Sequence, residues 1–224
     1  FILLPDLAYE TKQVGYSISE SIESLVKVIN KNKSIDIKSM AVAGVSFGGY
    51  ESLYLMTKNK WFKTGFSGAG IADLPSNAMS FTKSMAIPNY FKAETQQPRM
   101  DSNLFDNYQG YLENSPIYHL KKMNQPMLLW LGQNDSNVNP DQSRMFFLGM
   151  KRLNKKGILL EYPNEGHTIN KKENRLDLNV KGWQWMEYHL KGKPVAGNRS
   201  DGSCMDCSSA FFINLFSKTL WPGF

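Results

Sequence analysis

Short apolar runs alternate with amphipathic segments along this chain of 224 residues. The apolar runs have the length of buried strands, and they occupy residues 1–4, 40–45, 62–67, 126–132 and 158–162. Apolar positions recur with the helical period in four other segments, at residues 16–30, 50–60, 141–153 and 175–190. This alternation predicts an α/β fold in which a mainly parallel sheet carries helices on both faces, joined by right-handed crossovers.

Two of the predicted helices have a defined apolar face. The first, over residues 16–30, is amphipathic, with Ser17 or Ser19 as its expected N-cap. Its apolar positions are Ile18, Ile22, Leu25, Val26 and Ile29. The last helix, over residues 175–190, is predicted to bury Leu176, Leu178, Trp183, Met186 and Leu190.

Residues 71–114 follow no clean period, and their aromatic side chains are scattered among polar ones. A long irregular stretch in a compact domain is typical of a lid or a binding surface. The alternative is two or three short helices that pack on the sheet edge. The residues leave both interpretations open.

The composition changes beyond residue 193. Residues 197–209 are small and polar, and residues 211–224 are rich in aromatic side chains. We therefore expect a domain over residues 1–193 and a C-terminal tail over residues 194–224. The tail is either an appended edge element or a segment foreign to the domain.

The overall composition is that of a globular protein, with 42% hydrophobic and 12% aromatic residues. The formal net charge is +6 and the pI is near 9.2. Because the basic residues are scattered and no DNA- or RNA-reading motif accompanies them, they indicate a solvated surface and no nucleic-acid partner. The sequence assigns no oligomeric state.

No apolar segment reaches the ~20 residues that a membrane-spanning helix requires. The two cysteines, Cys204 and Cys207, make a single C-x-x-C pair, which is half a zinc site. We take the pair as functionally silent, with a local disulfide as the lesser alternative, and we expect no metal and no cofactor. Since the chain opens at Phe1 inside an apolar run, we expect its natural start upstream and assign no compartment.

The chemistry of the chain begins at Gly44–Gly48, which reads Gly-Val-Ser-Phe-Gly. An apolar strand enters this segment and a helical pattern leaves it, which is the context that gives a G-x-S-x-G motif its meaning. Small residues on either side let the backbone turn sharply and keep the Ser46 hydroxyl clear of the helix. The Phe47 N–H, at the start of that helix, is the expected oxyanion-hole donor.

Two further polar residues follow apolar strands, Asp135 after residues 126–132 and His167 after residues 158–162. Functional groups gather beyond the carboxyl ends of parallel strands, and the order Ser…Asp…His is that of an α/β-hydrolase. A serine hydroxyl needs a base to take its proton, and the base needs a carboxylate to fix its tautomer. His119 and His189 compete for the role of base, but their surroundings indicate surface or packing residues.

Three segments resemble the catalytic domain of the prolyl oligopeptidase family of serine peptidases. They are Gly44–Tyr50 (Gly-Val-Ser-Phe-Gly-Gly-Tyr), Gly132–Val138 (Gly-Gln-Asn-Asp-Ser-Asn-Val) and Glu165–His167 (Glu-Gly-His). Pro5-Asp6 and Ile35-Asp36 are also similar, and the resemblance covers about residues 1–193. It implies an α/β-hydrolase fold and hydrolysis of peptide bonds in short peptides, through an acyl-enzyme on Ser46.

The same resemblance implies that Asn137 and Val138 contact the peptide substrate, and Tyr50 is a further candidate. It also implies that the first strands of the catalytic domain and an N-terminal β-propeller are missing from this chain. We therefore expect an N-terminally truncated domain that is poorly stable and nearly inactive by itself.

Two other functions remain open. A carboxylesterase or acyl-hydrolase would use the same triad, since fold does not decide substrate. A non-catalytic binding module on a hydrolase scaffold would be favoured by replacement of Ser46, Asp135 or His167, and all three are present.

Overall fold

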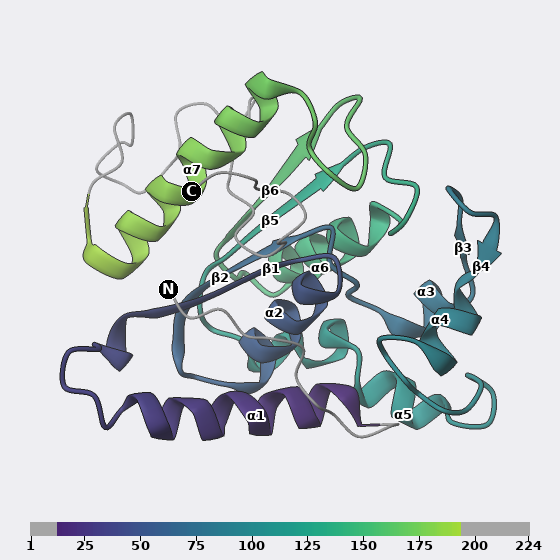
Figure 1. Ribbon diagram of the computed structural model, residues 1–224, viewed down its shortest axis with the longest axis horizontal. Helices are drawn as coiled ribbons and strands as arrows, with labels where there is room; N and C mark the ends of the chain where they lie inside the picture. The colour runs from purple at the N-terminus through teal and green to yellow at the C-terminus, as the bar shows by residue number, and fades with distance from the viewer. Residues whose placement is uncertain (1–12, 194–224) are drawn as a thin grey trace.

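A computed structural model of the chain describes residues 13–193 (Figure 1). The strand expected at residues 1–4, the tail from residue 194 and both cysteines lie outside these residues. The helices are α1 (Val14–Ile29), α2 (Phe47–Lys58), α3 (Leu74–Ala78), α4 (Asn89–Thr95), α5 (Tyr108–Glu113), α6 (Asp141–Arg152) and α7 (Lys172–Lys191), with 3₁₀ turns η1 (Ile37–Ser39) and η2 (Pro116–Lys122). The strands are β1 (Met40–Val45), β2 (Phe62–Gly68), β3 (Phe81–Thr82), β4 (Ile87–Pro88), β5 (Met127–Gly132) and β6 (Gly157–Tyr162).

The central sheet of the described residues has the order β1-β2-β5-β6, and every neighbouring pair is parallel. The carboxyl ends of these strands therefore share one edge of the sheet. β3 and β4 form a separate antiparallel hairpin beyond that edge. The predicted mainly parallel sheet is confirmed.

Alternating side chains of β5 divide the interior into two cores. Met127 and Leu129 pack into the larger core, which α1, α2 and α6 share. Leu128 and Trp130 point the other way, into the core closed by α7. Figure 1 shows α7 on one face of the sheet and α1 and α2 on the other, as the alternation predicts.

The start of α1 differs from the prediction. Its N-cap is Gln13, without a side-chain cap, and Ser19 lies inside the helix with its Oγ 3.2 Å from Asn59 Oδ1. The Gly15 N–H donates to Asn114 Oδ1 at 2.8 Å, and a Cβ on Gly15 would meet the Tyr54 ring at 2.4 Å. Contacts with distant segments therefore extend the helix to an earlier residue than its own capping signals indicate.

The buried face of α7 also differs. Leu178 is 3% exposed, as predicted, but Leu176 and Trp183 are 62% and 54% exposed. Trp185 packs instead against the sheet, and its indole N–H donates to Thr64 Oγ1 at 2.7 Å. One narrow face of a helix meets a flat sheet, so that face cannot include positions 176 and 183, which lie together on another side.

Residues 71–114 fold into α3, α4, α5 and the β3–β4 hairpin. The interpretation as short helices is therefore correct. Several of these residues also line the cavity described below. Within residues 13–193, no helix is long and apolar enough to span a membrane.

Candidate active site

Ser46 occupies a strained turn between β1 and α2. Its backbone dihedral angles, φ 60° and ψ −119°, define a conformation that non-glycine residues rarely adopt. The Ser46 N–H donates to the Gly68 carbonyl at 2.8 Å, and the Tyr50 N–H donates to the Ser46 carbonyl at 3.0 Å. These bonds hold the turn between β2 and the first turn of α2, so the hydroxyl projects from the carboxyl edge of the sheet.

The glycines around Ser46 differ in whether the surrounding structure leaves space for a Cβ atom. A Cβ on Gly44 would lie 2.0 Å from the Gly48 carbonyl oxygen, so the turn itself requires Gly44. A Cβ on Gly48 would find its nearest neighbour at 3.8 Å, in ordinary contact. A Cβ on Gly49 would lie 2.6 Å from the Gly68 carbonyl oxygen. The tight packing of α2 therefore depends on Gly49 rather than on Gly48 of the motif.

Asp135 follows β5 in a turn that buries and orients its carboxylate. Its side chain is 1% exposed. Oδ1 accepts the backbone N–H groups of Asn137 (2.8 Å) and Val138 (3.0 Å). These two bonds compensate for burial of the carboxylate and leave Oδ2 for one more donor.

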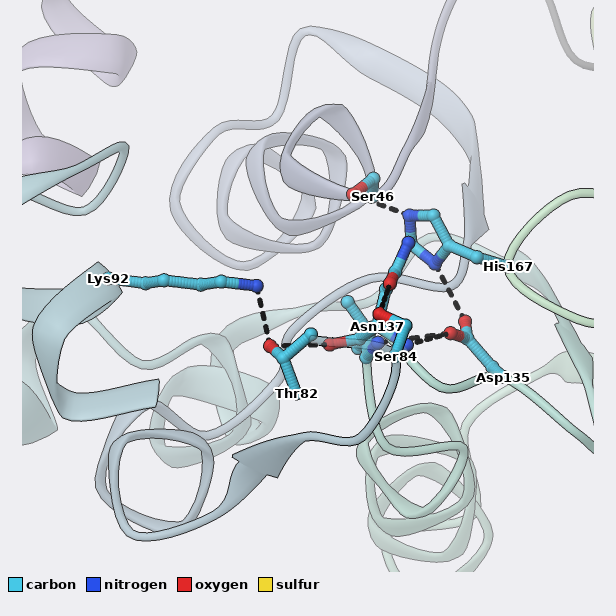
Figure 2. Close-up of polar contacts among 8 residues, drawn as sticks. Ser46, Thr82, Ser84, Lys92, Asp135, Asn137 and His167 are labelled. Carbon is cyan, nitrogen blue, oxygen red and sulfur yellow. Dashed lines mark hydrogen bonds and ion pairs between the residues drawn. The ribbon is translucent and has the colours of Figure 1, made fainter. Parts of the chain in front are cut away.

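That donor is His167, on the loop after β6. Its Nδ1 lies 2.8 Å from Asp135 Oδ2, and its Nε2 lies 2.9 Å from Ser46 Oγ (Figure 2). Because a carboxylate only accepts, Nδ1 carries the proton and Nε2 is left to accept from the serine hydroxyl. The structure thus brings the three predicted residues into one hydrogen-bonded chain.

Glu165 holds the histidine loop, a role that its place in the Glu165–His167 segment did not predict. Its carboxylate is buried and accepts from Asn170 N (2.8 Å), Lys171 N (3.1 Å) and Asn174 Nδ2 (2.6 Å). Its carbonyl accepts from Asn134 N at 2.8 Å. Glu165 therefore connects the loop to the start of α7 and to the turn before Asp135. An acidic residue just ahead of a helix start was the available signal.

A cavity of about 270 Å³ opens beside Ser46 and His167. Phe47, Asn137 and Val138 are among the residues that line it. Asn137 Oδ1 accepts from Ser84 Oγ at 2.5 Å, so the β3–β4 hairpin fixes its amide and leaves Nδ2 as a donor.

Tyr50 is not brought to this cavity. It is 0% exposed, its hydroxyl donates to the Asn114 carbonyl at 2.9 Å, and its ring stacks on Phe47 at 5.3 Å. This position in the core corrects the expectation that Tyr50 contacts substrate. The side chain projects from α2 into the larger core.

The other two histidines serve packing. His119 Nε2 lies 2.7 Å from the Glu113 carbonyl, and its ring meets the Tyr54 ring edge-on. His189 packs between Trp185 and Tyr188, and burial lowers its pKa to about 4. Neither competes with His167 for Ser46. In the part of the chain that the structure describes, no group of His, Cys, Asp and Glu is arranged to hold a metal ion.

The parallel sheet, the strained serine turn and the Ser46–His167–Asp135 chain define a serine hydrolase of the α/β-hydrolase class. The model of the prolyl oligopeptidase family matches residues 8–193, and the chain belongs to that family.

Its relatives agree with this assignment. The chain is 27% identical over 179 residues to the acylamino-acid-releasing enzyme of Rattus norvegicus, covering 79% of this chain and 24% of that enzyme. It is 28% identical over 165 residues to the inactive dipeptidyl peptidase 10 of Mus musculus, covering 72% and 19%. The Pyrococcus horikoshii acylaminoacyl peptidase has a TM-score of 0.68 at 22% identity, over 84% of this chain and 30% of that structure, which shows a shared fold. The chain spans about a quarter of the length of the curated relatives it matches.

Proposed function

We propose that this chain carries the catalytic centre of a serine peptidase that hydrolyses peptide bonds in short peptides. The observation that carries the proposal is the unbroken hydrogen-bonded chain from Ser46 Oγ through His167 to the buried Asp135. Family membership alone would be insufficient, because one relative is named inactive. The proposed catalytic unit is residues 1–193, whose C-terminal limit coincides with that of the family match.

The proposed reaction has two halves. Ser46 Oγ attacks the carbonyl carbon of the peptide bond while His167 Nε2 takes the serine proton. The tetrahedral intermediate collapses, the C–N bond breaks, and His167 returns the proton to the departing amine, leaving the acyl group on Ser46. Water then attacks the ester, His167 takes its proton, and the serine hydroxyl is restored as the acid leaves.

One backbone N–H and one side-chain amide would donate hydrogen bonds to the substrate. The Phe47 N–H, at the first residue of α2, would donate to the oxyanion, and such a donor contributes about 3 kcal/mol to the transition state. Asn137, with its Nδ2 left as a donor, would hold a substrate carbonyl beside Val138 in the cavity.

A fluorophosphonate probe tests the nucleophile on the full-length protein. We expect covalent labelling of Ser46 and none in Ser46→Ala, with both proteins showing the same thermal unfolding. Labelling that persists in Ser46→Ala, or that is absent from a folded wild-type protein, would refute the proposal.

Matched amide and ester substrates test the reaction. A peptidase must protonate a poor amine leaving group, so we expect hydrolysis of fluorogenic dipeptide amides that requires Ser46. Labelled enzyme that cleaves only the esters would instead identify an acyl-hydrolase.

A further inference from the structure

The wall of the cavity beside Ser46 carries a cationic side chain. Among residues 13–193, the charged or titratable side chains that line the cavity are His167 and Lys92, which lies on α4. No Asp or Glu of those residues lines the cavity. The remaining polar side chains that line it are the Ser46 hydroxyl and amides, including Asn89 and Asn137. A substrate in this space therefore meets one fixed cation and no carboxylate.

Lys92 is held in place from the hairpin side. Its Nζ donates to Thr82 Oγ1 at 2.5 Å, and the Thr82 hydroxyl donates to the buried Asn89 Oδ1, also at 2.5 Å. Asn89 Nδ2 in turn donates to Ser80 Oγ at 2.9 Å. Figure 2 shows the Lys92 side chain extended toward Thr82, on the side of Thr82 away from Asp135. The ammonium is thus tethered by neutral partners.

The ammonium group has more donors than the protein satisfies. An ammonium carries three N–H groups, and the described residues provide Lys92 with one acceptor, a neutral hydroxyl. No carboxylate oxygen in residues 13–193 lies within ion-pair distance of its Nζ. Lys92 is half-buried, and this burial lowers the pKa of its ammonium group. A ligand carboxylate would supply the missing counter-charge.

We propose that Lys92 makes this site select peptides that bring a carboxylate into the cavity beside the scissile bond. The inference rests on the proposed function and names its substrate class. The carboxylate has two possible sources in a short peptide, an acidic side chain before the scissile bond and the C-terminal carboxylate beyond it. Asn137 Nδ2 offers a second donor on the same wall.

Substrate pairs that differ only in charge test the inference on the full-length protein. The first pair is Ala-Glu and Ala-Gln as fluorogenic amides, and the second is Ala-Gln-Ala as free acid and as C-terminal amide. A charge-assisted hydrogen bond in a partly buried site predicts a preference of about tenfold or more in kcat/KM for the charged member of one pair. Which pair shows the preference identifies the source of the carboxylate.

Variants then assign the preference to Lys92. Lys92→Met should bring the ratio within the pair close to one, and Lys92→Arg should keep most of it. Lys83→Met is the matched control, because Lys83 is exposed on the neighbouring β3–β4 hairpin and does not line the cavity. It removes the same charge and should leave the ratio unchanged.

Each outcome decides the matter. A wild-type enzyme that is labelled at Ser46 but shows no preference in either pair overturns this inference and leaves the proposed function standing. A preference that survives Lys92→Met, or that disappears equally in Lys83→Met, also overturns it. Absence of both labelling and hydrolysis would refute the proposed function and this inference together. If Lys92→Met does not fold, Lys92→Gln replaces it as the variant that removes the charge, and the absence of a preference in both wild-type pairs still overturns the inference.

Discussion

Removing the Glu165 carboxylate should loosen the loop that carries His167. Glu165 is 2% exposed, and its carboxylate accepts three hydrogen bonds, from Asn170, Lys171 and Asn174. Hydrogen bonds to a charged group contribute about 1.5–3 kcal/mol each. Asn170 and Lys171 are themselves exposed, so water replaces part of what they lose. We therefore expect Glu165→Ala to cost about 3 kcal/mol of unfolding free energy.

This loss is measurable by thermal unfolding of the full-length protein. In a domain of about 150–250 residues, 1 kcal/mol shifts the Tm by about 2–4 °C, so Glu165→Ala should lower it by roughly 6–12 °C. Glu165→Gln keeps one acceptor oxygen, so its Tm should lie between those of the wild type and Glu165→Ala. Because the loop carries His167, the fluorophosphonate labelling rate should also fall, by up to about a hundredfold for a displacement near 1 Å.

Glu173→Ala is the control for charge alone. Glu173 lies exposed in the first turn of α7, where its interaction with the helix dipole contributes no more than about 1 kcal/mol. This variant should have nearly the wild-type Tm and labelling rate. If Glu165→Ala matched Glu173→Ala in both measurements, the three hydrogen bonds would not be what holds the histidine loop.

Three further substitutions test the packing of α2 and the burial of Asp177 on α7. Gly49→Ala should lower the free energy of unfolding by about 2–3 kcal/mol. The new Cβ would lie 2.6 Å from the Gly68 carbonyl oxygen and 2.8 Å from Gly70 Cα, which are both backbone atoms. A Cβ on Gly48 would have its nearest neighbour at 3.8 Å, so the unfolding free energy of Gly48→Ala in denaturant should stay within about 1 kcal/mol of the wild-type value. Equal effects of Gly48→Ala and Gly49→Ala would contradict this packing. A separate prediction concerns Asp177: burial raises its pKa to about 6, so its ionisation opposes folding and stability is lost as the pH rises from about 4 through 6. Asp177→Asn should therefore raise the Tm more at about pH 7.5 than at about pH 4, and a pH-independent difference would count against it.

The strands were predictable because burial on both faces of a parallel sheet demands a continuous apolar run. The segment 40–45 became β1 without a change of boundary, and the segment 126–132 became β5 with a change of one residue. Helix limits and faces were less determined by local sequence. The start of α1 depends on Tyr54 and Asn114, and the face of α7 depends on the sheet that it crosses.

The residue types of the site, and the strand ends that carry them, were predictable from the amino-acid order alone. Ser46, Asp135 and His167 each follow an apolar strand, and parallel strands bring their carboxyl ends to one edge. The distances of 2.8 and 2.9 Å within the triad, the burial of Tyr50, the hydrogen bonds of Glu165 and the place of Lys92 in the cavity wall follow from the fold. A periodic pattern of apolar residues records which side of a helix or strand faces the core. The hydrogen-bond partner of a polar side chain is set instead by segments far away in the chain, so the local sequence does not predict it.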